Sequence, residues 1–442
     1  MFKHRQSDDG NPASAIADWP PVVVAGAYQT GVVLMRDLAR RGVETYCFDC
    51  DTDNPGFRTV YGRASASPNP DENPQGWFEF MVDLSKRVGR KPVLIPSADQ
   101  FVSAIAREAA RLREHFIFSE EGIAAQASLA TKEYQYELAP AHGLAVPRSK
   151  VARSLDEVKA FADGCTFPCI MKPLHFRHWE QLSPENPLRG KKLKVAADAE
   201  ELYTAYLSCS GVTPSVVLQE EICGPDTAKL VYLSCYSITG RRLGSCIVRE
   251  LRTTPIHFGS ASICESTRDD ESDALCDRFL SGIGYKGVCE IELKRDTRTG
   301  QVMMIEANPR YSVTADAAPY AGVPLGWLHY LDVIGKNPAP VSPRGNHFRH
   351  IVLARDCLAA PSYVSEGALS WWAIIRTYKP PVAFFDFDVR DWRVSLDTLR
   401  HVARILLGKA WRRCRRGLFA RAEAGERPSG SAQLARVPKP AP

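Results

Sequence analysis

The sequence has no long apolar run and no strong excess of charge of either sign. Its most apolar run, Ala368–Ile375, is far shorter than the roughly 18 residues that a membrane-spanning helix needs, so we expect no transmembrane segment. The 56 basic and 51 acidic residues leave a net charge of only +5, which does not indicate a nucleic-acid-binding surface. We therefore expect a soluble protein without a nucleic-acid partner.

Cysteine is present but not in the patterns of a disulfide framework or a zinc site. The 13 cysteines include a single CxxC pair, Cys47 and Cys50, with no second Cys or His pair at matching spacing. We interpret this pair as core thiols rather than as a zinc or redox centre. The odd number of cysteines, and the lack of an apolar signal core within Met1–Trp19, indicate the reducing cytoplasm.

The first part of the chain predicts an α/β domain over residues 20–120. An apolar strand, Val22–Ala25, is followed by a glycine turn, Gly26–Gly31, and by an amphipathic helix, Val33–Arg41. A second strand, Thr45–Phe48, ends in acidic residues, as in Rossmann-like units. The turn lacks the middle glycine of the dinucleotide fingerprint, so we interpret it as a tight βα turn and not as an NAD site.

Residues 121–340 differ from the first domain in how their strands are connected, because several of these strands are joined as hairpins. One hairpin is predicted within Lys229–Arg252, and another joins Gly287–Lys294 to Val302–Arg310. These hairpins predict an antiparallel sheet, and a smaller α+β subdomain is expected at about 145–220. Residues 341–408 are expected to be an accessory region packed on this sheet, with an acceptor-binding surface as the alternative.

The last hairpin gathers oxygen ligands on one face. Glu306 and Asn308 are two residues apart on one strand and therefore point to the same side, while Glu292 lies on the partner strand. Carboxylate and amide oxygens are the ligands that Mg²⁺ prefers. Arg310 continues the same face, where a guanidinium would stabilise a transferring phosphoryl group or an acyl-phosphate oxygen.

These two strands, Gly287–Asp296 and Met304–Arg310, resemble the metal-binding strands of the ATP-grasp superfamily, in its carboxylate-amine ligase branch with the D-aspartate ligase-like proteins. The resemblance covers most of residues 20–335. It implies an ATP-grasp fold with an N-terminal Rossmann-like domain, a central lid subdomain and a C-terminal antiparallel sheet. It also implies that Glu292, Glu306 and Asn308 bind two Mg²⁺ ions, with Mn²⁺ as an alternative, and that Arg310 touches phosphate or the reacting carboxylate.

The same resemblance implies a nucleotide site. Lys132 and Lys172 match the two family lysines that contact the triphosphate, and lysine suits phosphate oxygens as a point charge. The remaining matches are the hinge residues Gln219 and Glu220 at the base edge, Ile222 packed near the base, Asp226 on the ribose hydroxyls, and Arg249 and Arg252 on the γ-phosphate or the substrate carboxylate.

The resemblance implies an ATP-dependent ligase that joins a small-molecule carboxylate to an amine through an acyl phosphate, releasing ADP and phosphate. One departure matters: Leu174–Leu193 stands where many ATP-grasp enzymes have a glycine-rich loop over the phosphates. A non-catalytic ATP-binding protein is therefore an alternative. Carboxylase or carbamoyl-phosphate chemistry is another, although the chain contains no biotin-carrier or glutaminase segment.

The C-terminal residues 409–442 are expected to be a basic segment and a disordered tail. Lys409–Arg421 interleaves basic residues with Trp411, Leu418 and Phe419, a composition that suits an anionic membrane surface. The alternative is a solvated helix end. We accordingly expect a cytoplasmic protein, with peripheral contact at the inner membrane surface as one option and a homodimer as another, and the sequence names neither substrate.

Overall fold

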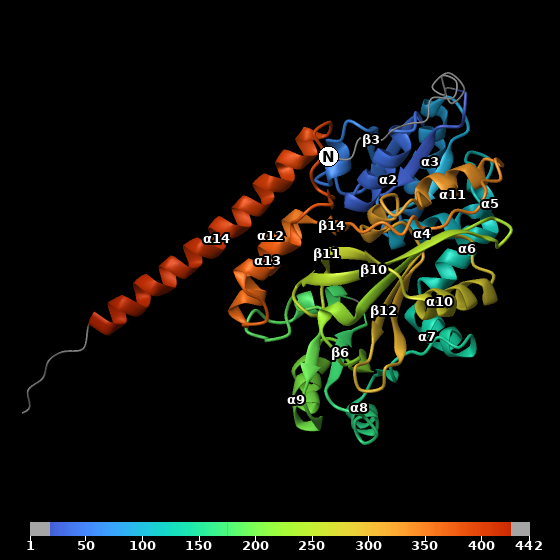
Figure 1. Ribbon diagram of the computed structural model, residues 1–442. Coiled ribbons are helices and arrows are strands. Elements are labelled where there is room, and N and C mark those ends of the chain that lie inside the picture. The colour runs from blue at the N-terminus through green and yellow to red at the C-terminus, as the bar shows by residue number, and fades with distance from the viewer. Residues whose placement is uncertain (1–17, 175, 426–442) are drawn as a thin grey trace, which may run out of the picture.

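The structure is a computed structural model that describes residues 18–174 and 176–425 (Figure 1). Its N-terminal domain is built on a parallel sheet. The strand order is β3–β2–β1–β4, and β1 is central and wholly buried, as expected for a parallel sheet covered on both faces. The elements are β1 (Val22–Ala25), α2 (Gln29–Ala39), β2 (Thr45–Asp49), η1 (Pro55–Phe57), β3 (Arg63–Ala66), α3 (Pro74–Val88), β4 (Val93–Pro96), α4 (Asp99–Arg107), α5 (Ala109–Leu112) and α6 (Glu120–Leu129).

Helix α2 begins four residues earlier than the sequence predicted. The amide of Val32 already donates to the carbonyl of Tyr28, so the helix starts inside the glycine turn. Gly31 permits this because a Cβ there would lie 2.0 Å from the carbonyl oxygen of Gly26, a contact no other residue could make.

A second, smaller sheet has the strand order β5–β8–β6–β7, with antiparallel neighbours. Its elements are β5 (Ser149–Ala152), α8 (Leu155–Ala162), β6 (Cys169–Pro173), η2 (Phe176–Gln181), β7 (Lys194–Ala196), α9 (Ala199–Ser210) and β8 (Val216–Glu220). The segment that replaces a glycine-rich loop contributes Trp179, Leu182 and Leu188 to the core of this subdomain. It is therefore anchored by apolar side chains, and not an open glycine loop.

The largest sheet runs β13–β12–β9–β10–β11–β14–β15 and is antiparallel except at β14–β15. One face packs on α7 and α10, and much of the other packs on the N-terminal domain. The elements are α7 (Lys132–Ala141), η3 (Asp226–Ala228), β9 (Lys229–Tyr236), β10 (Arg242–Thr254), β11 (Ser260–Thr267), α10 (Asp270–Gly282), β12 (Gly287–Arg295), β13 (Val302–Asn308), η4 (Thr314–Ala317), α11 (Leu325–Val333), β14 (Arg349–Ile351), α12 (Leu353–Ser365), α13 (Trp371–Thr377) and β15 (Val382–Phe384).

Residues 341–408 are continuous with the large sheet, because β14 and β15 extend its edge and α12 lies against β10 and β11 (Figure 1). The segment after β15 then returns to the N-terminal domain. There the Asp388 carboxylate lies 3.3 Å from the guanidinium of Arg36 on α2 and 2.7 Å from that of Arg40, the residue that caps the C-terminus of α2. This region thus ties the two ends of the fold together.

The basic segment forms the second half of a long helix, α14 (Trp392–Gly425), which projects from the body of the molecule (Figure 1). Nine of its residues are Lys or Arg and two are Asp or Glu. The side chains from Lys409 onward, and residues 426–442, lie outside the described residues, so membrane contact and a disordered tail stay predictions. Within the described part of the chain, no helix combines the length and the apolarity needed to cross a bilayer.

Candidate active site

The predicted metal ligands lie on the paired strands β12 and β13. The register sets Glu292 opposite Glu306 and Glu290 opposite Asn308, and directly opposed residues of an antiparallel pair share a face. Four oxygen-bearing side chains therefore project to the same side of the sheet. The sequence analysis missed Glu290, although the alternation of Glu290 and Glu292 about Ile291 was a signal for it.

Two carboxyl groups on this face have raised pKa values. Burial, followed by the Glu306 and Glu290 carboxylates, raises the pKa of Glu292 well above its usual range. Glu290 is buried too; its Oε1 accepts a hydrogen bond from Asn308 Nδ2 at 3.1 Å and its Oε2 accepts one from Ser312 Oγ at 2.5 Å. Burial also raises the pKa of Glu290.

The donor set fits a hard cation by its chemistry. All four side chains offer oxygen, and a divalent ion would offset both the burial and the mutual repulsion that raise the pKa of Glu292. The set is not drawn together as in a closed metal centre: in the described residues, no three or more His, Cys, Asp or Glu side chains form a metal-binding group. Glu306 Oε2 instead lies 3.4 Å from the ammonium of Lys132.

The two predicted phosphate lysines approach the carboxylates from other elements. Lys132 begins helix α7, and Lys172 lies on β6 of the small sheet, where its Nζ donates to Gln219 Oε1 at 2.9 Å. Burial, followed by the Lys132 charge, lowers the pKa of Lys172 to about 8, while Glu306 and Glu292 act in the opposite direction. The fold therefore brings both lysines and Gln219 to the carboxylate face.

The side chains of the remaining predicted nucleotide-binding residues have different surroundings. Glu220 follows Gln219 on β8 and so points to the other side, where its Oε1 accepts the Thr166 amide at 2.9 Å. Ile222 is buried just beyond the strand. Asp226 is also buried; its Oδ2 accepts a hydrogen bond from the Tyr363 hydroxyl and lies 3.1 Å from Nδ1 of His257.

Two buried lysines that the sequence did not single out also lie on this face. Lys229 and Lys294 stand opposite each other on β9 and β12. Burial, followed by the Lys229 charge, lowers the pKa of Lys294, while Glu221 and Asp226 oppose that change. The pattern of a strand does not distinguish a buried lysine from an exposed one, so the sequence held no signal for them.

The structure does not bring Arg249 and Arg252, the other two predicted catalytic residues, to the carboxylates. Arg249 is opposite Leu230, whose other neighbour is Leu293, so Arg249 lies on the face away from Glu292. Arg252 follows a bulge in β10 and is 1% exposed. Its guanidinium holds the Asp356 carboxylate through two hydrogen bonds of 2.8 Å, which leaves it committed to a buried ion pair.

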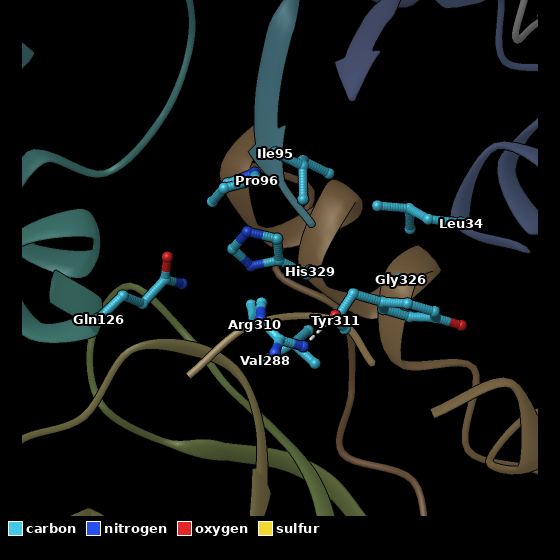
Figure 2. Close-up of a pocket in the computed structure, with 9 residues that line it drawn as sticks. All are labelled: Leu34, Ile95, Pro96, Gln126, Val288, Arg310, Tyr311, Gly326 and His329. Carbon is cyan, nitrogen blue, oxygen red and sulfur yellow. Dashed lines mark hydrogen bonds between the residues drawn. The ribbon is translucent and has the colours of Figure 1, made fainter. Parts of the chain in front are cut away.

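Arg310 does reach the carboxylate face, at the junction with the N-terminal domain. Its guanidinium donates to both carboxylate oxygens of Asp99, at 2.7 and 3.1 Å, and to Asn308 Oδ1 at 3.4 Å. Beside it lies a cavity with room for about one water molecule. Figure 2 shows the lining: Leu34, Ile95, Pro96, Gln126, Val288, Arg310, Tyr311, Gly326 and His329. It is too small to hold a substrate.

Three residues that line this cavity carry a buried polar atom without a hydrogen-bond partner in the described structure: Gln126 (Oε1), Tyr311 (the hydroxyl) and His329 (Nδ1). Burial lowers the pKa of His329 to about 4, so the imidazole is neutral at physiological pH. The cavity therefore adds polar groups, but no second cation, beside Arg310.

No family model matches the chain. Among curated proteins, the chain is 23% identical over 258 residues to the D-aspartate ligase of Enterococcus faecium, covering 55% of this chain and 59% of that one. It is 23% identical over 195 residues to the large chain of the arginine-specific carbamoyl phosphate synthase of Geobacillus stearothermophilus, covering 42% and 17%. The chain thus spans less than two thirds of the length of these curated relatives.

Solved structures resemble the chain over a larger share. The N5-carboxyaminoimidazole ribonucleotide synthetase of Thermus thermophilus matches with a TM-score of 0.54 and 13% identity, over 73% of this chain and 81% of that one. An L-amino acid ligase of Bacillus licheniformis matches with a TM-score of 0.53 and 14% identity, over 71% and 74%. At such identities these matches establish a shared fold.

Proposed function

Because the chain has the ATP-grasp fold of these solved structures, we propose that it is an ATP-dependent carboxylate-amine ligase. The observation that carries the proposal is the meeting of Lys132 and Lys172 with the paired carboxylates Glu292 and Glu306. Lysine ammonium groups suit the phosphate oxygens of a triphosphate, and neighbouring carboxylates suit the divalent ion bound with it. The ligase names of two similar proteins lend further support.

The nucleotide would lie between the small sheet and the large sheet. Lys132 and Lys172 would bind phosphate oxygens, Gln219 and Ile222 would meet the base, and Asp226 would accept hydrogen bonds from the sugar hydroxyls. Glu290, Glu292, Glu306 and Asn308 would hold Mg²⁺, in one or two ions, with Mn²⁺ as an alternative. Bound Mg²⁺ neutralises charge on a transferring phosphoryl group.

In this reaction an oxygen of the substrate carboxylate attacks the γ-phosphorus, the bond to the ADP oxygen breaks, and an acyl phosphate forms. The amine nitrogen then attacks the acyl carbon, phosphate leaves, and the nitrogen loses a proton as the amide forms. No protein nucleophile is needed, so alignment and charge carry the catalysis. Arg310, which donates a hydrogen bond to Asn308, would orient the substrate carboxylate and neutralise the oxygen on which charge develops.

The test is ADP release from Mg-ATP in the presence of pools of amino acids and small carboxylates. We expect turnover in particular pools, and its loss in Glu306→Gln and in Glu290→Gln with little change in melting temperature. Glu265→Gln is the matched control, since Glu265 is paired with Arg249 on the far face of the same sheet. Turnover that survives in Glu306→Gln would contradict the proposal, and ATP binding with no turnover in any pool would favour a non-catalytic ATP-binding protein.

A further inference from the structure

The two oxygens of the Asp226 carboxylate have different surroundings. Oδ2 accepts a hydrogen bond from the Tyr363 hydroxyl and lies 3.1 Å from His257 Nδ1. Oδ1 has no hydrogen bond in the described structure, and its nearest charged partner is the Lys229 ammonium at 3.9 Å. The residue is only 7% exposed. A buried carboxylate with one oxygen anchored and the other available is set up to accept a hydrogen bond from a ligand.

The anchoring groups come from outside the nucleotide hinge. Tyr363 lies on α12, within residues 341–408, and its hydroxyl also accepts the Thr253 amide at 3.1 Å. Burial, followed by the hydrogen bond to Asp226, raises the pKa of Tyr363 to about 12, so the hydroxyl keeps its proton and remains a donor. The C-terminal region therefore reaches the carboxylate directly, across 137 residues of sequence.

His257 is held in place as firmly as the tyrosine. It has a φ of 68°, which is uncommon for a residue with a side chain and persists only where the surroundings enforce it. Its Nε2 lies 3.0 Å from Glu366 Oε2, and its ring stands edge-on to Tyr363 at 5.7 Å. Its carbonyl accepts a hydrogen bond of 2.6 Å from Lys229.

Asp226 belongs to the same electrostatic unit as the phosphate lysines. Lys229 lies 3.9 Å from Asp226 and 3.6 Å from Glu250, and its charge is one of those that lower the pKa of Lys172. The free oxygen of Asp226 is thus part of the cluster that holds Lys172 and the paired carboxylates. A ligand bound by those lysines would have its remaining hydroxyl groups within this cluster.

We infer that Tyr363 and His257 are positioning residues for the nucleotide, which hold Asp226 so that its Oδ1 accepts a hydrogen bond from a sugar hydroxyl. This inference rests on the proposed ATP site. It assigns a role in nucleotide selection to the C-terminal region, because a sugar that lacks the hydroxyl cannot donate to a carboxylate oxygen that can only accept. Without the tyrosine and the histidine, Asp226 would turn toward Lys229 and lose this selectivity.

The experiment measures the affinity of the full chain for Mg-ATP, 2′-deoxy-ATP and 3′-deoxy-ATP by titration calorimetry, which requires no turnover. Two variants are compared, Tyr363→Phe and Tyr378→Phe. Each removes one tyrosine hydroxyl that donates to a buried aspartate, but Tyr378 donates to Asp356, beside the Arg252 ion pair. The second variant is therefore a control for a purely structural loss.

The wild-type chain is expected to bind one of the deoxy nucleotides about tenfold more weakly than ATP, as for one lost hydrogen bond to a charged group. Tyr378→Phe is expected to keep this ratio, and Tyr363→Phe to reduce it to about threefold or less. His257→Asn is a second variant, at a half-buried position and with a side chain that tolerates a positive φ, so it tests the idea even where Tyr363→Phe does not fold.

If folded Tyr363→Phe and His257→Asn keep the wild-type ratio of affinities for ATP and the deoxy nucleotide, the inference is overturned. The two contacts to Asp226 would then have a structural role only. Equal affinity of the wild-type chain for ATP and for both deoxy nucleotides would overturn it too, while leaving the proposed ATP site intact. Failure of the wild-type chain to bind any of the three would refute the proposed function itself, so the two failures are distinguishable.

Discussion

The ammonium of Lys172 is expected to lose its proton near pH 8, far below an exposed lysine. Burial and the Lys132 charge lower its pKa from 10.5 to about 8, since a second cation and a partly apolar setting both disfavour the charged form. At pH 7.4 roughly a fifth of Lys172 would then be neutral, against about one in a thousand for an unperturbed lysine. The neutral fraction thus differs by about two hundredfold.

Brief acylation with an amine-selective reagent at a series of pH values, followed by peptide mass spectrometry, measures this fraction. Lys150 is the reference, because it is exposed on β5 of the same sheet. Partial burial slows the labelling of Lys172 at every pH but leaves its midpoint near pH 8. Bound Mg-ATP should move the midpoint upward, since phosphate favours the charged ammonium.

The same shift predicts a pH-dependent affinity for ATP. Above pH 8 the free protein must take up a proton on Lys172 to bind, so affinity should fall by up to about tenfold per pH unit, and Lys172→Met should bind weakly without this dependence. A labelling midpoint for Lys172 above pH 10, as for an ordinary lysine, would refute the reasoning. So would an ATP affinity that falls equally in Lys172→Met.

Replacement of Asp356 by Asn leaves Arg252 buried without its counter-ion and is expected to cost about 3–5 kcal/mol of stability, whereas Asp273→Asn, in a partly exposed pair, should cost about 1 kcal/mol or less. Thermal denaturation measures the stability lost in each variant, and equal losses in the two variants would contradict the argument from burial. If the basic segment contacts membranes, the full chain should sediment with vesicles that contain phosphatidylglycerol but not with pure phosphatidylcholine, through a salt-sensitive attraction; a solvated helix end predicts sedimentation with neither. Replacement of the four arginines within Arg412–Arg416 by Glu should then abolish sedimentation with the anionic vesicles. Sedimentation that is unchanged in this variant would show that this segment does not bind them.

The sequence predicted that Glu292, Glu306 and Asn308 share one face of the sheet, because this geometry is local. Glu306 and Asn308 share a face through the alternation of one strand, and a short turn sets their partner strand. The same alternation holds Glu290, so its omission was an error of reading. The ATP-grasp fold expected from these strands and from Lys132 and Lys172 was confirmed by the similar solved structures.

The positions of Arg249 and Arg252 could not be predicted from the sequence in this way. Simple alternation would place Arg249 and Arg252 on opposite faces of β10, because they are three residues apart, but a bulge between Glu250 and Thr253 breaks the alternation. Whether Arg252 is free then depends on Asp356, which lies 104 residues away and is brought to it by the packing of α12. No spacing within the strand holds that information.

The sequence by itself determined the hairpins, the order of lysines and carboxylates along the chain, and which side chains share a strand face. These depend on residues a few positions apart, whose backbone geometry fixes their relation. Only the tertiary structure decided that Lys229 and Lys294 are buried beside the site and that Tyr363 anchors Asp226. Burial and such pairings arise when distant elements pack, because the neighbours that exclude water come from the whole chain.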